Sequence, residues 1–227
     1  MKICVLSSGS KGNTTYIESE KVKILIDIGN SAKYVKEKLE DIGVEPEEIN
    51  AVLITHTHVD HVKGLKVFEN KYNIPVYITD VMLKSLDYLN NYVFLENEFD
   101  IGDMHIIAIK TSHDTPDSRG YIIISGDDSI VYITDTGYIN KKYFDILSNR
   151  NVYVMESNHD IEMLNTVCKA VDNPVIASGG CGSIQDIVDV FEKTNVDAAL
   201  VASLFHFNEA TVEDVRNECK KHGLNVR

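Results

Sequence analysis

The sequence segment that is most informative about the fold is Ala51-Val52-Leu53-Ile54-Thr55-His56-Thr57-His58-Val59-Asp60-His61. Its first four residues are apolar and partly β-branched, which predicts a short strand buried on both faces. Three histidines and an aspartate follow where this strand ends and the chain turns toward a helix, a usual place for a site in an α/β protein. The two histidines of His-x-His can hold one metal ion, and Asp60 and His61 can reach a second.

Two metal ions about 3.5–4 Å apart suit hydrolysis, because both can act on the same water molecule. The alternative is a solvated polar loop that is rich in histidine by chance. A loop of that kind has no reason to follow a core strand with this spacing. The motif therefore indicates metal-assisted hydrolysis, with Asp60 as the residue that orients the attacking water.

Composition limits the classes of partner. The chain has 227 residues, 44% of them apolar, enough for one large domain or two small ones. Its 22 basic and 35 acidic residues give a net charge of −13, so the overall field does not attract nucleic acid. A substrate that carries phosphate must be held by local contacts, through metal ions and a few basic groups.

The sequence also bears on the compartment. There is no run of 18 apolar residues, and residues 1–6 resemble a first strand rather than a signal peptide, so we expect no membrane association. The four cysteines have no paired spacing, which is typical of reduced thiols. These features predict a cytoplasmic protein; they leave its oligomeric state open.

Elements on either side of the motif follow from apolar runs and turn residues. The loop at residues 8–13 is glycine-rich but lacks the ending of a phosphate-binding P-loop, which favours a hairpin turn. Asp27 interrupts an apolar strand, and two roles stay open for it: orienting a ligand histidine, or capping a turn. We expect strands at residues 3–7, 14–18, 22–28, 76–79, 105–111, 121–125, 130–134 and 152–155, and helices at 31–42, 64–71 and 81–89.

An apolar strand, a Thr or Ser, and then a ligand-type residue occur three times, at His56, His113 and Asp135. Strand ends at one rim of a sheet can converge on one point, so His113 and Asp135 are candidate ligands, and Asp135 could bridge two ions. His105 lies within a strand and is expected to be structural. For His159, after the strand at 152–155, a contact with the site and a structural role are equally open.

These residues resemble the metallo-β-lactamase fold, whose signature is Thr-His-x-His-x-Asp-His followed by an isolated His and Asp. The stretches Val-Leu-Ser-Ser-Gly-Ser-Lys-Gly-Asn and Glu-Ser-Asn-His-Asp-Ile-Glu-Met-Leu are similar to the YycJ/WalJ-type bacterial members, which are regarded as metal-dependent nucleases. The resemblance implies an αββα sandwich and a divalent cofactor, Zn or Mn, as one or two ions. It implies that His56, His58 and His113 hold one ion and Asp60 and His61 the other, with Asp135 between them.

The resemblance covers residues 1–165 and then stops. The family pattern continues with a Gly-His in a helix and a last histidine after a late strand, and this sequence has neither, which implies an incomplete second metal site. Residues 166–227 instead resemble the C-terminus of the cyclase subunit of imidazole glycerol phosphate synthase. In that resemblance Gly179, Gly180 and Ser203 match phosphate-binding positions.

The residues themselves agree with two β/α units, with strands at 175–178 and 198–203 and helices at 184–193 and 212–222. Glycine-backed helix N-termini after the last two strands of a (β/α)₈ barrel commonly bind phosphate. Two units cannot close such a barrel, and the strands that carry the cyclase's catalytic aspartates are absent. We therefore expect a truncated metallo-β-lactamase-like domain at 1–165 and a barrel-like segment at 166–227. A natural fusion, a recombined gene and an assembly artefact all remain open for the join.

The leading functional hypothesis is a nuclease-like metallohydrolase; its phosphodiester substrate comes from the resemblance, since the fold alone does not choose it. Two alternatives stay open: a fragment of the cyclase of histidine biosynthesis, and a metal- or phosphate-binding module without turnover. A strand at 198–203 could add to the open edge of the truncated sheet and bring His206 to the second ion. The opposing interpretation is that His206 is inherited from the cyclase and has no such role.

Overall fold

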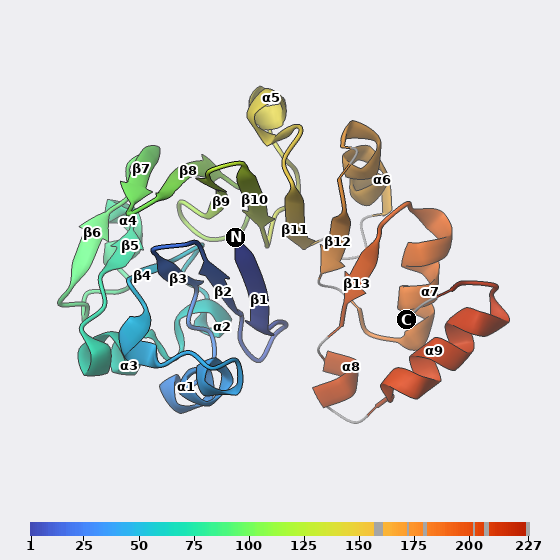
Figure 1. Ribbon diagram of the computed structural model, residues 1–227, viewed down its shortest axis with the longest axis horizontal. Coiled ribbons are helices and arrows are strands. Elements are labelled where there is room, and N and C mark those ends of the chain that lie inside the picture. The colour runs from blue at the N-terminus through green and yellow to red at the C-terminus, as the bar shows by residue number, and fades with distance from the viewer. Residues whose placement is uncertain (157–160, 172, 179–180, 202, 207–208, 226–227) are drawn as a thin grey trace.

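A computed structural model of the protein shows two β-sheets with helices outside them (Figure 1). The residues that it describes are 1–156, 161–171, 173–178, 181–201, 203–206 and 209–225. The strand order is β1-β2-β3-β4-β5-β6 in one sheet and β13-β12-β11-β10-β9-β8-β7 in the other.

The first sheet carries the motif strand at its centre. Strands β1 to β3 pair antiparallel, and β3 to β6 pair parallel. All three residues of β4 are buried because the sheet is covered on both faces, as the apolar run predicts. The strands are β1 (Lys2–Ser7), β2 (Thr14–Glu18), β3 (Lys23–Ile26), β4 (Ala51–Leu53), β5 (Val76–Ile78) and β6 (Tyr92–Phe94).

The second sheet begins antiparallel, from β7 to β10, and continues parallel, from β10 to β13. Its strands are β7 (Glu98–Ile101), β8 (Met104–Lys110), β9 (Arg119–Ser125), β10 (Asp128–Ile133), β11 (Val152–Glu156), β12 (Val175–Ser178) and β13 (Ala198–Leu200).

Short helices connect the strands and cover the outer faces. They are α1 (Ala32–Asp41), η1 (Pro46–Glu48), α2 (Val59–Val62), α3 (Leu65–Tyr72), α4 (Asp80–Leu83), η2 (Lys141–Tyr143), α5 (Phe144–Leu147), α6 (Ile161–Ala170), α7 (Ile184–Lys193), α8 (Ser203–His206) and α9 (Val212–Lys221). None of the helices in the described ranges is long and apolar enough to cross a membrane.

The apolar core has three layers. A central cluster joins the facing sides of the sheets, with Leu53 from the first and Tyr121 from the second. Outside the first sheet, Val35 of α1 and Phe68 of α3 pack on its outer face. Outside the second sheet, Leu147 of α5 lies in a cluster with strand residues. The helix–sheet–sheet–helix order confirms the predicted αββα sandwich.

The C-terminal segment extends the second sheet. Strand β12 pairs parallel with β11, and β13 pairs parallel with β12. Leu164 of α6 is fully buried against Val175 and Ala177 of β12 and against Val190 of α7. Hydrogen bonding and packing therefore continue across residue 165. The division into parts of different origin at that residue stays a prediction.

The structure differs from the expected order of the edge strands. The strand expected at residues 198–203 to join the open edge ends at Leu200 and lies one place further out, as β13. Strand β12 comes first in the chain, directly after the crossover helix α6, and it takes the place beside β11. Helix α8 then begins at Ser203, within the range expected to be strand.

Other elements also differ from the sequence prediction. The helix expected at residues 81–89 is α-helical only over Asp80–Leu83, because the following turns use three-residue hydrogen bonds such as Ser85 N to Met82 O. Strands β6 and β7 were not expected. All three side chains of β6 are exposed at the sheet edge, so the run lacks the alternation of a half-buried strand.

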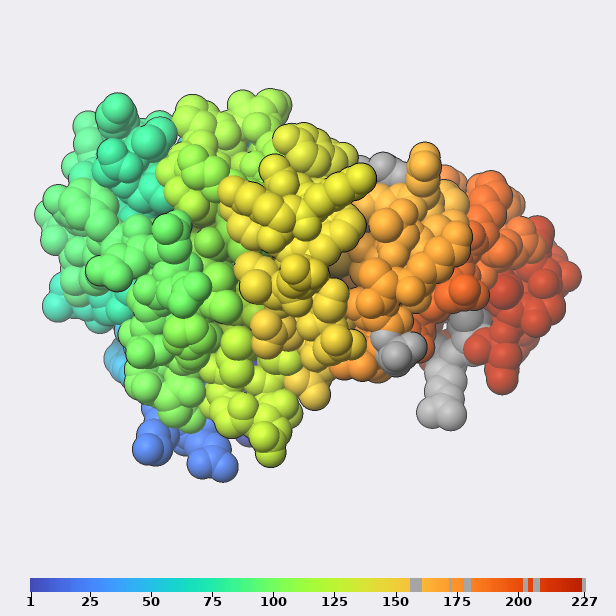
Figure 2. Space-filling model, turned by 90° about the horizontal axis from the view of Figure 1, so that it is seen from above, coloured from blue at the N-terminus to red at the C-terminus, as the bar shows by residue number. Residues whose placement is uncertain are grey.

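The outer face of the second sheet is incompletely filled. A largely apolar cavity of about 300 Å³ lies between β10 and β11, on one side, and α5 and α6, on the other. Phe144 and Leu147 line it from α5, and Met163 and Val167 from α6. Figure 2 shows these two regions next to each other, α5 in yellow and α6 in orange. The cavity thus lies where the segments of different resemblance meet.

Candidate metal centre

The predicted ligand residues come together from the ends of three strands. His56 and His58 lie in the loop after β4, and His61 is in the short helix α2. His113 follows β8, and Asp135 follows β10. These strands belong to both sheets, and their ends meet at one edge of the sandwich. The convergence predicted from the repeated strand–ligand pattern is therefore observed.

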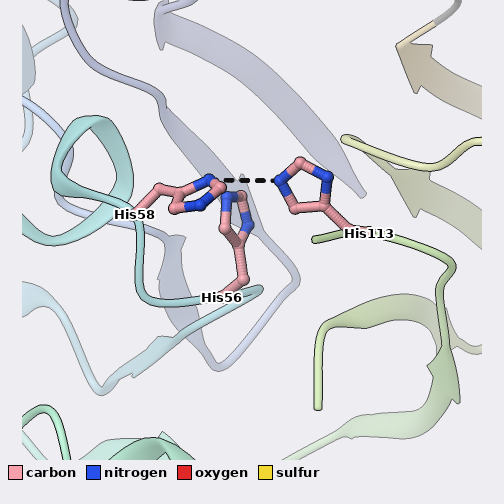
Figure 3. A group of neighbouring side chains, drawn as sticks. All are labelled: His56, His58 and His113. Atoms are coloured by element: carbon pink, nitrogen blue, oxygen red, sulfur yellow. Dashed lines mark hydrogen bonds between the residues drawn. The ribbon is translucent and has the colours of Figure 1, made fainter. Parts of the chain in front are cut away.

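His56, His58 and His113 form the first group (Figure 3). One ring nitrogen from each lies within 4.8 Å of the others. The Nδ1 atom of His58 is 3.2 Å from Nε2 of His113. Three imidazoles that face one another in this way match the three-histidine set of catalytic zinc sites.

A second group combines His56, His61 and Asp135, whose ligand atoms also lie within 4.8 Å of one another. The Nε2 atom of His61 is 3.2 Å from Oδ2 of Asp135 and 3.6 Å from Oδ2 of Asp60. Asp135 also lies 4.0 Å from Nε2 of His113, so it stands between the two groups. His56 is common to both, which was not predicted from the sequence.

The state of His56 fits a metal ligand. Its Nδ1 atom lies 3.0 Å from the Thr55 hydroxyl, whereas its buried Nε2 atom has no hydrogen-bond partner in the described part of the chain. Burial, together with the positive charge of His61, lowers the pKa of His56 to about 3. A buried imidazole nitrogen without a partner costs free energy, and coordination of a divalent ion would satisfy it. The donor set therefore fits such an ion.

His61 is held by Asp27, which is completely buried. Oδ2 of Asp27 lies 2.8 Å from Nδ1 of His61, and the backbone N–H and hydroxyl of Thr55 donate to the same carboxylate at 2.8 and 2.7 Å. Burial alone would lower the pKa of His61, but the carboxylates of Asp27 and Asp135 outweigh burial and raise it to about 10. Of the two roles left open for Asp27, these contacts favour the orienting one.

Asn13 contacts the site and was not predicted from the sequence. Its Nδ2 atom lies 2.9 Å from Nε2 of His61 and 3.2 Å from Oδ2 of Asp60. The backbone is fixed as well, since Asn13 N donates to Asp60 O at 2.7 Å. A Cβ on Gly29 would lie 1.7 Å from the same carbonyl oxygen, so only glycine fits there. The Gly-Asn that ends the loop at residues 8–13 was the available signal; the loop itself is a β1–β2 hairpin turn, as expected.

Several predicted residues are not placed at the site. His159, Gly179 and Gly180 lie outside the described residues. Ser203 and His206 begin and end α8, but the described part of the structure does not extend to their side chains. His105 is a half-exposed residue of β8 whose Nδ1 atom lies 2.8 Å from Asp100 Oδ1.

Comparison with protein families gives two matches. Residues 8–165 match the family model described as the metallo-beta-lactamase superfamily. Residues 155–211 match the one described as histidine biosynthesis protein. The two matched ranges overlap in the region of α6, which agrees with the change of resemblance near residue 165.

Curated relatives divide in the same way. The chain is 34% identical over 175 residues to exodeoxyribonuclease WalJ of Streptococcus pneumoniae, covering 73% of this chain and 65% of that protein. It is 32% identical over 168 residues to exodeoxyribonuclease YycJ of Bacillus anthracis, covering 70% and 64%. The C-terminal part is 61% identical over 72 residues to the HisF subunit of imidazole glycerol phosphate synthase of Lactococcus lactis subsp. cremoris, covering 32% and 28%. The chain thus spans less than two thirds of each relative.

Solved structures show the fold. The metallo-beta-lactamase fold protein YhfI of Bacillus subtilis superimposes with a TM-score of 0.70 at 14% identity, over 88% of this chain and 96% of that one. A metallo-beta-lactamase of Cronobacter sakazakii gives a TM-score of 0.55 at 14% identity, over 67% and 74%. Because the match to the first structure covers 88% of this chain, it extends beyond residue 165 into the segment that contains β12 and β13.

Proposed function

The chain belongs to the metallo-β-lactamase superfamily, and from this premise we propose that it is a metal-dependent hydrolase that cleaves phosphodiester bonds in a nuclease-like reaction. The observation that carries the proposal is the pair of ligand groups that share His56. The substrate class rests on the two relatives named as exodeoxyribonucleases.

The proposed ligands are divided between two positions. His56, His58 and His113 would hold one divalent ion, Zn or Mn, and His61, Asp60 and Asp135 would hold the other. When bound, such ions lower the pKa of a water molecule and neutralise negative charge on the attacked phosphate. The second position lacks the last histidine of the family pattern, so we propose that its ion is held more weakly.

The protein's own side chains would orient the reactants. The Asp60 carboxylate is partly exposed and is fixed on one side by the Asn13 amide, which leaves it able to orient the attacking water and take up its proton. Asp27 fixes the ring of His61 through Nδ1 and so directs Nε2 toward Asp60 and Asp135.

The test is hydrolysis of a labelled DNA oligonucleotide by the full-length chain, after chelation and after Mn²⁺ or Zn²⁺ is added back. We expect metal-dependent release of nucleotides that His58→Ala and Asp60→Asn each lower at least 100-fold. His105→Ala, on the surface of β8, is the matched control and should keep the parent rate. Full activity in the His58 or Asp60 variant, or hydrolysis that persists with chelator, would refute the proposal.

We do not propose cyclase activity. The segment that resembles HisF covers 28% of that relative, and its strands β12 and β13 lie in an open sheet beside β11. We propose instead that the two parts of the chain, which meet at residue 165, have different origins.

We also propose a cytoplasmic location. Within the described residues the four cysteines form no disulfide bond, which supports this proposal.

A further inference from the structure

A second cavity adjoins the candidate metal centre. It has a volume of about 430 Å³ and lies between the β1–β2 loop and the start of α2. Asp60 forms part of its wall and also faces His61, so the cavity and the metal centre share a side chain. Its lining residues are Ser10, Lys11, Asn30, Val59, Asp60 and Lys63.

The chemistry of the lining suits an anion. Lys11 and Lys63, both exposed, line this cavity in a chain whose net charge is −13. Ser10 adds a hydroxyl to the lining, and Asn30 adds an amide that also donates to the Gly12 carbonyl at 3.4 Å. A protein with an acidic overall field must bind phosphate through a local cluster of this kind, because long-range attraction is absent. The Asp60 carboxylate would repel an anion, so we expect the lysines rather than Asp60 to hold it.

The backbone under the two lysines is tightly held. Gly29 packs against the Asp60 carbonyl, and Gly29 N donates to Asn13 O at 2.9 Å. A Cβ on Gly64, next to Lys63, would lie 2.1 Å from the Asn30 carbonyl oxygen. The β1–β2 loop, Asn30 and α2 are therefore locked to one another by backbone contacts. The backbone of Lys11 and Lys63 is therefore fixed relative to Asp60. Less backbone freedom is lost when a ligand binds, which lowers the entropic cost of binding.

We propose that this cavity binds a phosphate group of a nucleic-acid strand that neighbours the phosphate being cleaved. The inference rests on the proposed function and specifies its substrate: a chain of at least two phosphodiesters rather than a single ester. Lysine ammonium groups act as point charges toward phosphate, and each contact also releases counterions from the strand. Asp60, on the shared wall, marks the border between the bound phosphate and the cleaved one.

The experiment compares two substrates of the metal-loaded chain: bis(4-nitrophenyl) phosphate, which has one phosphate, and a DNA oligonucleotide. The double variant Lys11→Ala/Lys63→Ala should raise KM for the oligonucleotide at least tenfold more than KM for the small ester. Lys66→Ala/Lys71→Ala, on exposed positions of α3, makes the same change in net charge away from the cavity and should leave both values as in the parent. Lys11→Arg/Lys63→Arg should restore most of the oligonucleotide affinity.

A binding measurement separates this inference from the proposed function. Binding of a single-stranded oligonucleotide is measured by fluorescence anisotropy in the presence of chelator. The plot of log K against log salt has a negative slope, and we expect the double alanine variant to make it less steep by about 1.4. This is about 0.7 for each lysine that no longer neutralises a phosphate. Equal losses on both substrates, or an unchanged salt slope, would overturn the inference. If the double variant changes the slope although the parent chain hydrolyses neither substrate, the result would support phosphate binding in the cavity and refute the proposed hydrolase activity.

Discussion

Oδ2 of Asp27 lies 2.8 Å from Nδ1 of His61, and both side chains are completely buried. Asp27 has a positive φ of 60°. This backbone conformation costs about 1–3 kcal/mol and is concentrated at functional sites. Thr55, the residue before His56, donates two hydrogen bonds to the same carboxylate. One buried acid thus connects β3, the motif loop and α2.

Asp27→Asn should weaken metal binding about 10–100-fold, the usual effect of losing a carboxylate that orients a ligand histidine. The amide keeps the size of the side chain but removes the charge that raises the pKa of His61. Calorimetric titration of the chelated protein with Zn²⁺ measures the change. Asp100→Asn is the matched control, because Asp100 contacts the surface residue His105 at the same distance of 2.8 Å; equal losses in both variants would contradict the assigned role.

Asn13→Ala should reduce hydrolysis and weaken binding of the second ion, because the amide contacts both Asp60 and His61. We expect at least a tenfold lower kcat, with a smaller change in the affinity of the first ion. Zn²⁺ titration separates the two binding events. Asn70→Ala, on the exposed side of α3, should change neither quantity. If the variant loses both ions equally, Asn13 acts on the fold of the loop rather than on the second position.

Removal of metal should lower the stability of the whole protein, since an ion that binds only the folded chain adds about 2.7 kcal/mol at 100 times its Kd. We propose His56 as a ligand of the first, more tightly held ion, so His56→Ala should remove most of this increment. Thermal unfolding with Zn²⁺ and with chelator measures it. His105→Ala should retain the full increment, and a metal-dependent rise in Tm that is undiminished in His56→Ala would exclude His56 as a ligand.

Metal content after dialysis should be nearer one ion per chain than two, because we propose that the second position lacks the final histidine of the family pattern. His206→Ala tests the only histidine suggested as a substitute. We expect it to leave the metal content unchanged. Two tightly held ions in the parent chain, determined by elemental analysis, would contradict the incomplete second site; loss of one of them in His206→Ala would identify the missing ligand.

Leu164→Ala should destabilise the chain by about 2–5 kcal/mol, the usual cost of removing a fully buried leucine side chain. Since β12 continues the sheet beyond β11, we expect one cooperative urea transition that moves as a whole to lower urea. Thr166→Ala, exposed on the same helix, is the control. Two transitions, of which only the weaker one shifts, would show that the C-terminal segment folds separately.

The sequence was informative wherever local pattern determines structure. The apolar run before His56, and its repetition before His113 and Asp135, placed these candidate ligands at strand ends that converge. Asn13 could not be found in this way, because its contacts are with residues 47 and 48 positions further along the chain. The double use of His56 depends on ring orientation, which no spacing encodes. The positive φ of Asp27 and Asp135 likewise depends on tertiary contacts.

The pairing of β11 with β12 has a consequence for the order of events during synthesis. The proposed ligands all precede residue 136, so the part of the chain that contains them leaves the ribosome first. The central residues of β11 are buried in the finished fold, where β12 pairs with this strand. Strand β12 follows about 20 residues later in the chain, so it is synthesised roughly 1–4 s after β11 at ordinary rates of translation. During that interval the unpaired edge of β11 is open to other chains. The yield of the protein in the cell should therefore depend on how fast the ribosome passes from β11 to β12.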